Sequence, residues 1–205
     1  MPLVTRHSLL YLASANPGKL REFRQAAKAV GITIEPVPHI DRIPACVEDG
    51  ATFEDNARKK ALHYCAHVDG PVFTDDSGIC VAALGDAPGV HSARFAGPDA
   101  NDEANNRMLL EELRRVEAGS VHRNRIAHYV CVIVLAQDCR VVTVVEGRAP
   151  GLIIDEPRGK AGFGYDPYFF YPPLGKTFAE LSAEEKFAVS HRGEAFRKLL
   201  DYVRR

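Results

Sequence analysis

The first thirty residues alternate between two hydrophobic patterns, and this alternation limits the fold more than any other feature of the chain. Residues 9–13 form a short apolar run that predicts a buried strand. Residues 19–30 carry apolar side chains at helical spacing. A strand that leads directly into a helix is typical of α/β proteins. We therefore expect an α/β fold in which helices flank a central, twisted, mixed sheet.

The rest of the chain continues this alternation. Thr52 and Asp55 resemble a capping box, which places the start of a second helix at residue 53. The expected elements, in order, are a strand at 33–37, a helix at 53–68, a strand at 71–74, a helix at 102–116, a hairpin of 127–136 and 140–146 that turns around Asp138, and a last helix after 190–192. No repeat or linker separates them, so we expect one domain over residues 1–205.

Composition limits the partners. The 205 residues carry a formal net charge of -1, which gives no general attraction to nucleic acid or to membranes, so a small ligand is expected. Five cysteines without C-x-x-C spacing argue against a disulfide framework and a zinc site and predict reduced thiols. The chain shows neither a signal peptide nor an apolar run of about 20 residues, which predicts a cytoplasmic protein without a membrane span.

Two adjacent acids, Asp75 and Asp76, follow the apolar run 71–74 and are themselves followed by Ser77 and Gly78. We expect the strand to end at residue 74, which lets both carboxylates leave the core. Adjacent carboxylates repel each other unless a cation or solvent offsets the repulsion. Mg²⁺ prefers a few carboxylates together with substrate phosphates. The pair therefore predicts a metal–phosphate site, with an ordinary surface turn as the alternative.

A possible phosphate-binding loop lies between the first strand and the first helix. Backbone N–H groups at a helix N-terminus and a lysine can converge there on phosphate oxygens. The alternative is a plain loop with a solvated lysine, because the segment matches neither the Walker A nor the dinucleotide-binding pattern. Its residues are Ser14, Ala15, Asn16, Pro17, Gly18 and Lys19.

Three further groups of residues are candidates for the same site. Glu48 or Asp49 can complete the metal site, or both are exposed loop acids. The segment 162–167 places Phe163 and Tyr165 among glycines, where aromatic rings can stack on a flat ligand or can simply be buried in the core. Near the start of the last helix lie Lys186, His191 and Arg192, together with Ser190, which is a candidate N-cap.

Six short motifs follow one another in order along nearly the whole chain. Together they resemble the inosine triphosphate pyrophosphatase family. The motifs are SxNxxK (Ser14, Asn16, Lys19), TFEDNA (52–57), DDSG (75–78), PGVHSARFAG (88–97), GFGYDP (162–167) and SHRG (190–193).

This resemblance implies a homodimeric, Mg²⁺-dependent enzyme that converts ITP, dITP or XTP to the monophosphate and pyrophosphate. It implies two lobes around an active-site cleft, with Asp76 as the catalytic, metal-bound acid and Glu48 as the second metal ligand, although Asp49 stays an alternative. Arg192 or His191 are expected to donate to the 6-keto oxygen of the purine. The implied substrate-binding residues are Ser14, Ala15, Asn16, Pro17, Gly18, Lys19, Ser77, Phe163, Gly164, Tyr165, Asp166, Lys186, His191 and Arg192.

Three rival interpretations remain. A Maf-like pyrophosphatase has a related fold, but its opening loop favours Ser-Pro-Arg-like residues in place of Asn16 and Lys19. A nucleotide sensor without catalysis is disfavoured by the full acidic set of Glu48, Asp75 and Asp76. A nucleic-acid-binding module is disfavoured by the balanced charge.

Overall fold

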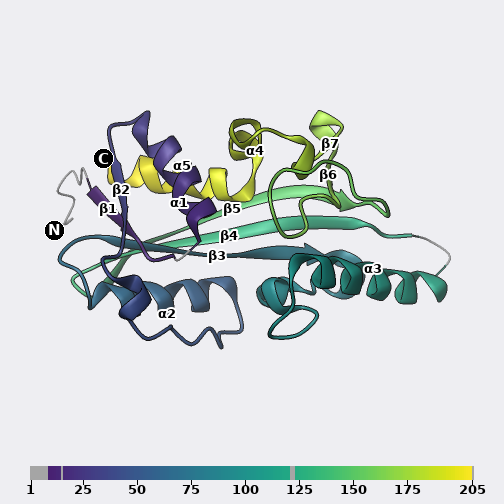
Figure 1. Cartoon of the computed structure of the whole chain (residues 1–205), viewed down its shortest axis with the longest axis horizontal. Coiled ribbons are helices and arrows are strands. Elements are labelled where there is room, and N and C mark those ends of the chain that lie inside the picture. The colour runs from purple at the N-terminus through teal and green to yellow at the C-terminus, as the bar shows by residue number, and fades with distance from the viewer. Residues whose placement is uncertain (1–8, 15, 121–122, 205) are drawn as a thin grey trace. The chain divides into compact units, whose positions relative to one another are not determined.

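The computed structural model describes residues 9–14, 16–120 and 123–204. Within them, seven strands form one sheet in the order β2-β1-β3-β4-β5-β6-β7 (Figure 1). β1 is parallel to β2 and β3, whereas β6 is antiparallel to β5 and β7, so the predicted mixed sheet is confirmed. The strands are β1 Leu9–Leu12, β2 Thr33–Pro36, β3 Val72–Val81, β4 Ile126–Gln137, β5 Arg140–Ile153, β6 Phe169–Tyr171 and β7 Lys176–Thr177.

Helices flank this sheet, as the sequence predicts. The α-helices of the described residues are α1 Pro17–Lys28, α2 Phe53–Cys65, α3 Asp102–Ala118, α4 Ala183–Val189 and α5 His191–Val203. Short 3₁₀ helices lie at Ile40–Arg42, Ala82–Leu84, Gly89–Arg94, Pro172–Leu174 and Phe178–Glu180. None of the helices in the described ranges is both long enough and apolar enough to cross a membrane.

The chain divides into two compact units. Unit 1 contains the described parts of Met1–Asp76, Cys131–Gly147 and Glu194–Arg205, and unit 2 contains those of Ser77–Val130 and Arg148–Gly193. The boundary in β3 falls between Asp76 and Ser77, which are consecutive residues. The expectation of a single domain over residues 1–205 stays a prediction.

In unit 1, helices α1 and α5 lie on one face of the sheet and α2 lies on the other (Figure 1). Three fully buried rings hold α1 and α5 to β3. Phe23 of α1 lies 5.2 Å from Phe73 of β3 and 4.7 Å from Phe196 of α5, measured between ring centroids. Burying aromatic side chains contributes much of the packing energy of a small core, so these contacts fix the face of the sheet on which α1 lies.

Unit 2 has its own core, in which aromatic rings of β4 and β6 meet the leucines of α3. Tyr129 lies 4.6 Å from Phe169, and Phe169 lies 4.7 Å from Phe178. Leu109 and Leu113 of α3 are fully buried in the same cluster. Their spacing of four residues places both on one face of the helix, as the predicted hydrophobic stripe requires.

Strand β3 is longer than the sequence predicts, and this corrects the expected position of Asp75 and Asp76. The strand does not end at residue 74 but continues to Val81, so both acids lie inside it. Asp75 is only 3% exposed and Asp76 only 9%. Acidic side chains are almost never buried unless they are paired. The prediction was wrong because the cations that pair with these acids come from distant parts of the chain.

Two other boundaries also differ from the predictions. Helix α1 begins at Pro17 rather than at residue 19, because Asn16 caps it and proline is well suited to the first helical position. Strand β5 continues to Ile153 rather than ending at residue 146. Local signals placed both elements correctly, but pairing with neighbouring strands decided where β5 ends.

Two local predictions are confirmed in detail. Thr52 caps α2 by accepting from the Asp55 backbone N–H, and the Asp55 side chain accepts in return from the Thr52 backbone. Strands β4 and β5 are neighbours joined by Asp138 and Cys139, which have φ values of 51° and 53°. Positive φ at both residues is typical of a two-residue hairpin turn.

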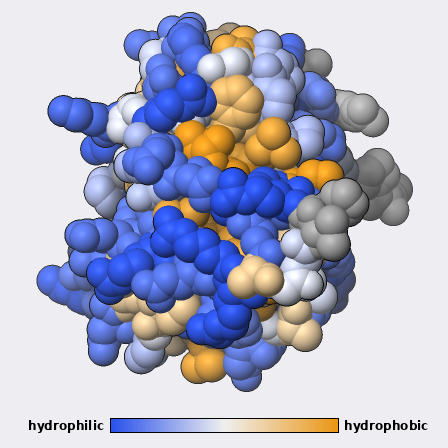
Figure 2. All heavy atoms as spheres, turned by 90° about the vertical axis from the view of Figure 1, so that its right-hand side faces the viewer, coloured by the Kyte–Doolittle hydropathy of each residue, from blue (hydrophilic) through white to orange (hydrophobic). Residues whose placement is uncertain are grey.

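The surface carries some exposed apolar side chains. The face in Figure 2 is mostly hydrophilic, with hydrophobic residues visible near its centre. In unit 2, the large apolar residues that are well exposed include Val116, Ile126, Phe163 and Leu174. Single exposed apolar residues are normal on protein surfaces. Of these four residues, Phe163 lines a cavity.

Candidate active site

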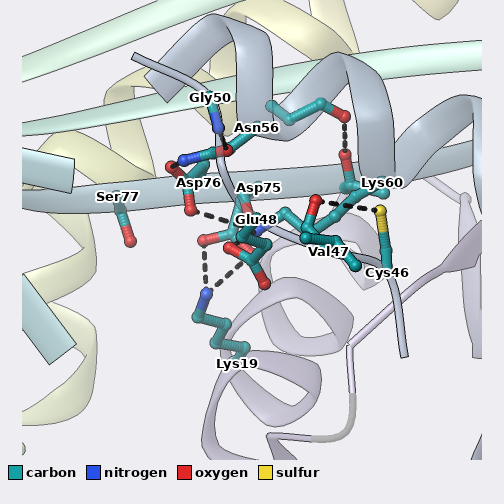
Figure 3. A network of polar contacts seen from close by, with 12 residues as sticks. Lys19, Cys46, Val47, Glu48, Gly50, Asn56, Lys60, Asp75, Asp76 and Ser77 are labelled. Carbon is teal, nitrogen blue, oxygen red and sulfur yellow. Dashed lines mark hydrogen bonds and ion pairs between the residues drawn. The ribbon is translucent and has the colours of Figure 1, made fainter. Parts of the chain in front are cut away.

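Asp75 and Asp76 point to opposite faces of β3, because successive side chains of a strand alternate. Asp75 meets Lys19 of α1, with 2.8 Å between the Lys19 Nζ and the Asp75 Oδ2. Asp76 meets Lys60 of α2, with 3.0 Å between the Lys60 Nζ and the Asp76 Oδ1. Each buried acid is therefore neutralised by the helix on its own side of the sheet, and Figure 3 shows both lysines directed at the strand.

Lys60 is the centre of this cluster. Its Nζ donates to three oxygens, namely the Glu48 Oε2 at 3.0 Å, the Asp76 Oδ1 at 3.0 Å and the Asp75 backbone carbonyl at 2.9 Å. Asn56, one helical turn before Lys60, donates to the second oxygen of Asp76 at 3.3 Å. One ammonium group thus brings two carboxylates together (Figure 3).

Burial and charge set the ionisation of this cluster. Burial raises the pKa of Asp76, the Lys60 charge and hydrogen bond oppose that rise, and the negative charges of Glu48 and Asp75 add to it. Burial lowers the pKa of Lys60, but the three neighbouring carboxylates outweigh this and raise the pKa overall. Lys60 is therefore held as a cation, while Asp76 becomes a stronger proton acceptor than an exposed aspartate.

Glu48 and Asp49 lie in different surroundings. Glu48 contacts Lys60, which in turn contacts Asp76. Asp49 instead pairs with Lys59, and the side chains of both residues are well exposed. The hydrogen bond and the charge of Lys59 hold the pKa of Asp49 below its usual value. Of the two acids left open by the sequence, the structure thus joins Glu48 to the Asp76 cluster.

The oxygen atoms of this cluster fit a hard divalent cation. The Glu48 and Asp76 carboxylates approach one point closely enough to share the Lys60 ammonium group. Mg²⁺ is bound by one or two carboxylates, with water and substrate phosphates as its other ligands. No group of three or more His, Cys, Asp or Glu side chains in the described ranges is arranged to hold a metal by itself. The donor set therefore fits a metal that the substrate helps to bind.

The loop before α1 is closed by its own side chains. Asn16 Oδ1 accepts from the backbone N–H groups of Gly18 at 2.8 Å and Lys19 at 3.3 Å, and Ser14 Oγ accepts from the Asn16 N–H at 3.2 Å. Two N–H groups expected to cradle phosphate are thus already used for capping. Ala15 lies outside the described residues.

Unit 2 contains a cavity of about 130 Å³. It is smaller than the roughly 300–1,000 Å³ of pockets that bury a whole drug-sized ligand, so it can enclose only part of a nucleotide. Its lining includes eight of the predicted site residues, namely Ser77, Phe163, Gly164, Tyr165, Asp166, Lys186, His191 and Arg192.

Asp166 organises one wall of this cavity. Its carboxylate pairs with the Lys186 ammonium group and accepts from the Phe163 backbone N–H at 2.9 Å. Both side chains of the pair are nearly sealed from solvent, at 4% exposure for Asp166 and 7% for Lys186. A Cβ at Gly162, which has a φ of +77°, would lie 2.0 Å from the Asp166 Oδ2. Only glycine allows the chain to pass so close to this carboxylate.

The two aromatic residues of this segment have different roles. Tyr165 is a core residue, buried to 4% exposure, and its hydroxyl donates to the Ser92 carbonyl at 2.8 Å. Phe163 is 40% exposed and lies beneath two cations, with 4.7 Å from its ring centroid to the Lys186 Nζ and 5.5 Å to the Arg192 Cζ. Tyr165 therefore forms part of the buried core beside the cavity, whereas Phe163 presents a ring to the cavity.

Gly164, between them, is held from both sides by α3. Its N–H donates to the Asp102 Oδ2 at 2.6 Å, and its carbonyl accepts from the Asn106 Nδ2 at 2.9 Å. Asp102 is the first residue of α3, and Asn106 lies one turn later. The helix therefore fixes the backbone beside Phe163.

His191 and Arg192 form the start of α5. Ser190 Oγ accepts from the Gly193 N–H at 3.2 Å, which agrees with its expected capping role. The His191 ring stacks on Tyr129, with centroids 4.5 Å apart and planes within 6°. Arg192 donates from Nη2 to the Ser77 Oγ at 3.3 Å. Both side chains are buried and line the cavity, so they offer hydrogen-bond donors in a site of low polarity.

The Ham1 family model matches residues 10–202. The chain belongs to the Ham1 family.

Relatives of this Ham1 protein share most of its length. A dITP/XTP pyrophosphatase from Syntrophobacter fumaroxidans is 48% identical over 94% of this chain and 81% of that protein. One of the same name from Ralstonia nicotianae is 48% identical over 95% and 96%. The structure of a HAM1 protein from Coxiella burnetii has a TM-score of 0.85 and 38% identity, covering 95% of this chain and 98% of that one. The predicted family resemblance is confirmed.

Sequence reasoning missed several residues of this Ham1 site. Lys60 is the most important of them, because it joins Glu48 to Asp76. Its only sequence signal was its position four residues after Asn56, beside the apolar stripe of α2. Asp102 and Asn106 were also missed, since each acts on Gly164 about 60 residues away. No local pattern marks a contact at that separation.

Proposed function

We propose that this protein is a nucleoside triphosphate pyrophosphatase that converts dITP, XTP and ITP to the monophosphate and pyrophosphate. The observation that carries the proposal is the buried Asp76 carboxylate. It shares the Lys60 ammonium group with Glu48 and has a raised pKa. The relatives named dITP/XTP pyrophosphatase support the choice of substrates. The reaction also serves to remove non-standard purines before they enter DNA or RNA.

In the proposed reaction, water attacks the α-phosphorus and pyrophosphate leaves. Asp76 orients the water and accepts its proton, a role favoured because its pKa is closer to neutrality than that of an exposed aspartate. Lys19, which contacts Asp75, supplies positive charge near the phosphates. No covalent intermediate on the protein is needed.

Magnesium is part of the proposal, with Glu48 and Asp76 as its protein ligands. Both are hard oxygen donors that already surround one ammonium group. When bound, the ion neutralises phosphate charge and lowers the pKa of coordinated water. Lys60 holds the two carboxylates together and offsets their mutual repulsion.

Base selection is assigned to the cavity of unit 2. The 6-keto oxygen of hypoxanthine or xanthine accepts a hydrogen bond, whereas the amino group of adenine does not. Arg192 and His191 supply donors, and the exposed ring of Phe163 supplies a surface on which a base can stack. A site built to make one substrate hydrogen bond can reject an analogue that lacks it by about 10⁴-fold.

A substrate panel tests this proposal. Purified protein with Mg²⁺ is incubated with dITP, XTP, ITP, dATP and dGTP, and each product is identified by anion-exchange chromatography. We expect monophosphate and pyrophosphate from the first three, and little product from dATP. Release of orthophosphate and a diphosphate would refute the cleavage position. Tight binding of dITP without any product would favour the nucleotide-sensor alternative.

The same preparation tests the finer parts of the proposal. Removal of Mg²⁺ with a chelator should abolish turnover, and added Mg²⁺ should restore it. We also propose that the protein is a cytoplasmic homodimer, as the family resemblance implies. Sedimentation equilibrium at micromolar concentration measures the assembly, and a mass of one chain would contradict the dimer.

A further inference from the structure

Two cysteines of unit 1 meet at a place that the proposed reaction does not use. Cys65 is the last residue of α2 and is buried to 4% exposure. Cys139 is exposed in the turn between β4 and β5. They are 74 residues apart in the sequence, yet the Cys139 backbone N–H donates to the Cys65 Sγ at 3.1 Å.

The pKa of the Cys65 thiol agrees with this proximity. Burial is the largest cause of its rise, and the neighbouring Cys139 thiol adds to it. Because an N–Cα bond is about 1.46 Å long, the Cys139 Cα lies within about 4.6 Å of the Cys65 sulfur. Because a cysteine sulfur lies only two bonds from its own Cα, this bound brings the Cys139 side chain within reach of the Cys65 sulfur, as an S–S bond requires.

The turn itself gives an independent reason to examine Cys139. Its φ of 53° lies in the left-handed region, which costs little for glycine but is unfavourable for most other residues. Two-residue turns of this kind prefer glycine at the second position. Cysteine there is thus not explained by the turn, and a residue kept in a strained conformation points to a function.

We propose that Cys139 and Cys65 form a peroxide-sensitive pair that closes to an intramolecular disulfide. In the first step, the Cys139 thiolate attacks hydrogen peroxide, which gives a sulfenic acid at Cys139 and releases hydroxide. In the second step, the Cys65 sulfur attacks the Cys139 sulfur, the new S–S bond forms, and water leaves. Peroxide is the oxidant, and two thiols lose two electrons and two protons in all.

The exposure of the two residues sets this order of events. Cys139 can meet peroxide because it is exposed, whereas Cys65 is shielded and is raised in pKa by burial. Reactive cysteines are accessible, and a neighbouring resolving thiol completes the disulfide before further oxidation. The new bond fixes the C-terminal end of α2, the helix of Lys60, to the β4–β5 hairpin.

The test is independent of the proposed function, because it measures thiols rather than turnover. The reduced full-length protein is treated with hydrogen peroxide, remaining thiols are alkylated, and the unreduced digest is analysed by mass spectrometry. We expect a cross-linked peptide pair containing Cys65 and Cys139, lighter by two hydrogen atoms than the two separate peptides. Cys80 and Cys131, which are buried, should stay reduced during the peroxide treatment and should therefore be found alkylated.

Variants separate the role of Cys139, which reacts with peroxide, from that of Cys65, which closes the disulfide. Cys139→Gly suits the turn and should fold well, and it should abolish the cross-link and leave Cys65 reduced. Cys65→Ala should leave Cys139 as sulfenic acid, trapped by dimedone, and then as sulfinic acid. Cys46→Ser, the matched control at another partly accessible thiol, should leave the cross-link unchanged.

Thermal unfolding gives a second readout. Oxidised wild-type protein should unfold at a higher temperature than the reduced form, by on the order of 5–10 °C for a disulfide closing a long loop. The same treatment should not raise the midpoint of Cys139→Gly. Sulfinic acid at Cys139 of the wild type with Cys65 still reduced would overturn the proposal, and so would a disulfide formed only between two molecules.

Discussion

Each unit contains a lysine paired with a buried aspartate, and the two pairs differ in what surrounds them. In unit 1, Lys60 divides its hydrogen bonds among Asp76, Glu48 and a backbone carbonyl. In unit 2, Lys186 pairs with Asp166 above the ring of Phe163. The first environment is rich in negative charge, and the second is aromatic and nearly dry.

This difference shows how one pair of residue types can serve two purposes. Burial, and after it the charges of Glu48 and Asp75, raise the pKa of Asp76, and the Glu48 side chain is still 37% exposed. That cluster is suited to exchange protons and to meet cations. Asp166 also holds the Phe163 backbone N–H, so its pair fixes the position of a loop. We therefore assign chemistry to the first pair and recognition to the second.

The strongest test of this comparison is Asp76→Asn. The change removes the charge but keeps the volume, so the fold should persist while turnover of dITP falls by about 10²–10⁴-fold, the usual contribution of a general base. Steady-state kinetics at saturating Mg²⁺ measures the loss. Asp49→Asn is the control, since Asp49 pairs with Lys59 on the surface. Equal losses in both variants would break the distinction between the two acids.

Lys60→Met should have the next largest effect, on stability. Losing the ammonium group leaves Glu48, Asp76 and a carbonyl without their shared donor. Breaking a buried ion pair costs about 3–5 kcal/mol, and we expect about 2–4 kcal/mol here because protonation of Asp76 limits the loss. Urea unfolding at neutral pH gives the value. Lys59→Met, which changes the adjacent but exposed lysine, should leave the urea midpoint nearly unchanged.

Lys186→Met tests the recognition role. We expect a KM for dITP that rises about tenfold, close to the 1.4 kcal/mol of one weakened charge-assisted contact, with a smaller change in kcat because Asp76 is untouched. Substrate-dependence curves for dITP separate the two constants. Lys176→Met, which removes an exposed lysine 3.7 Å from Glu185, is the control. A fall in kcat alone would place Lys186 in the chemistry and remove the contrast.

A modest effect is expected at Glu117 in unit 2, which belongs to neither pair. Its carboxylate accepts from the Arg125 Nη2 at 2.8 Å, and the Arg125 hydrogen bond holds the pKa of Glu117 below its usual value. A lowered pKa stabilises the fold above the unfolded-state pKa of about 4.3, and this stability is lost as the pH falls through the folded-state value.

Glu117→Gln should therefore lower the free energy of unfolding by about 1–2 kcal/mol at pH 7. The difference from wild type should shrink as the pH is lowered below about 4. Urea titrations at several pH values test this directly. A difference that stays constant with pH would mean that packing, and not charge, explains the loss.

Much of the local structure was predictable from the sequence, although strands β6 and β7 and helix α4 were not predicted. The capping box of Thr52 and Asp55, the stripe of α3 and the turn at Asp138 depend on residues a few positions apart. Their signals are contained in the sequence because capping bonds and helical faces join near neighbours. The six motifs also indicated the family, which the comparison of residues 10–202 confirmed.

The site itself was only partly predictable. The residues of the 162–167 segment were named, but their orientations were not, and the structure buries Tyr165 while leaving Phe163 exposed. Side-chain direction there depends on Gly164, which Asp102 and Asn106 hold from another helix. Such contacts follow from packing between distant segments, and no repeating pattern of residues in the sequence signals them.

By itself, the sequence determined the order of the elements and the identity of the acidic and basic residues. Only the tertiary structure decided that β3 runs through Asp75 and Asp76 instead of ending before them. The physical reason is that a buried carboxylate needs a partner. Lys19 and Lys60 supply those partners from 56 and 16 residues away, so the strand runs through the two acids because α1 and α2 bring these lysines to it.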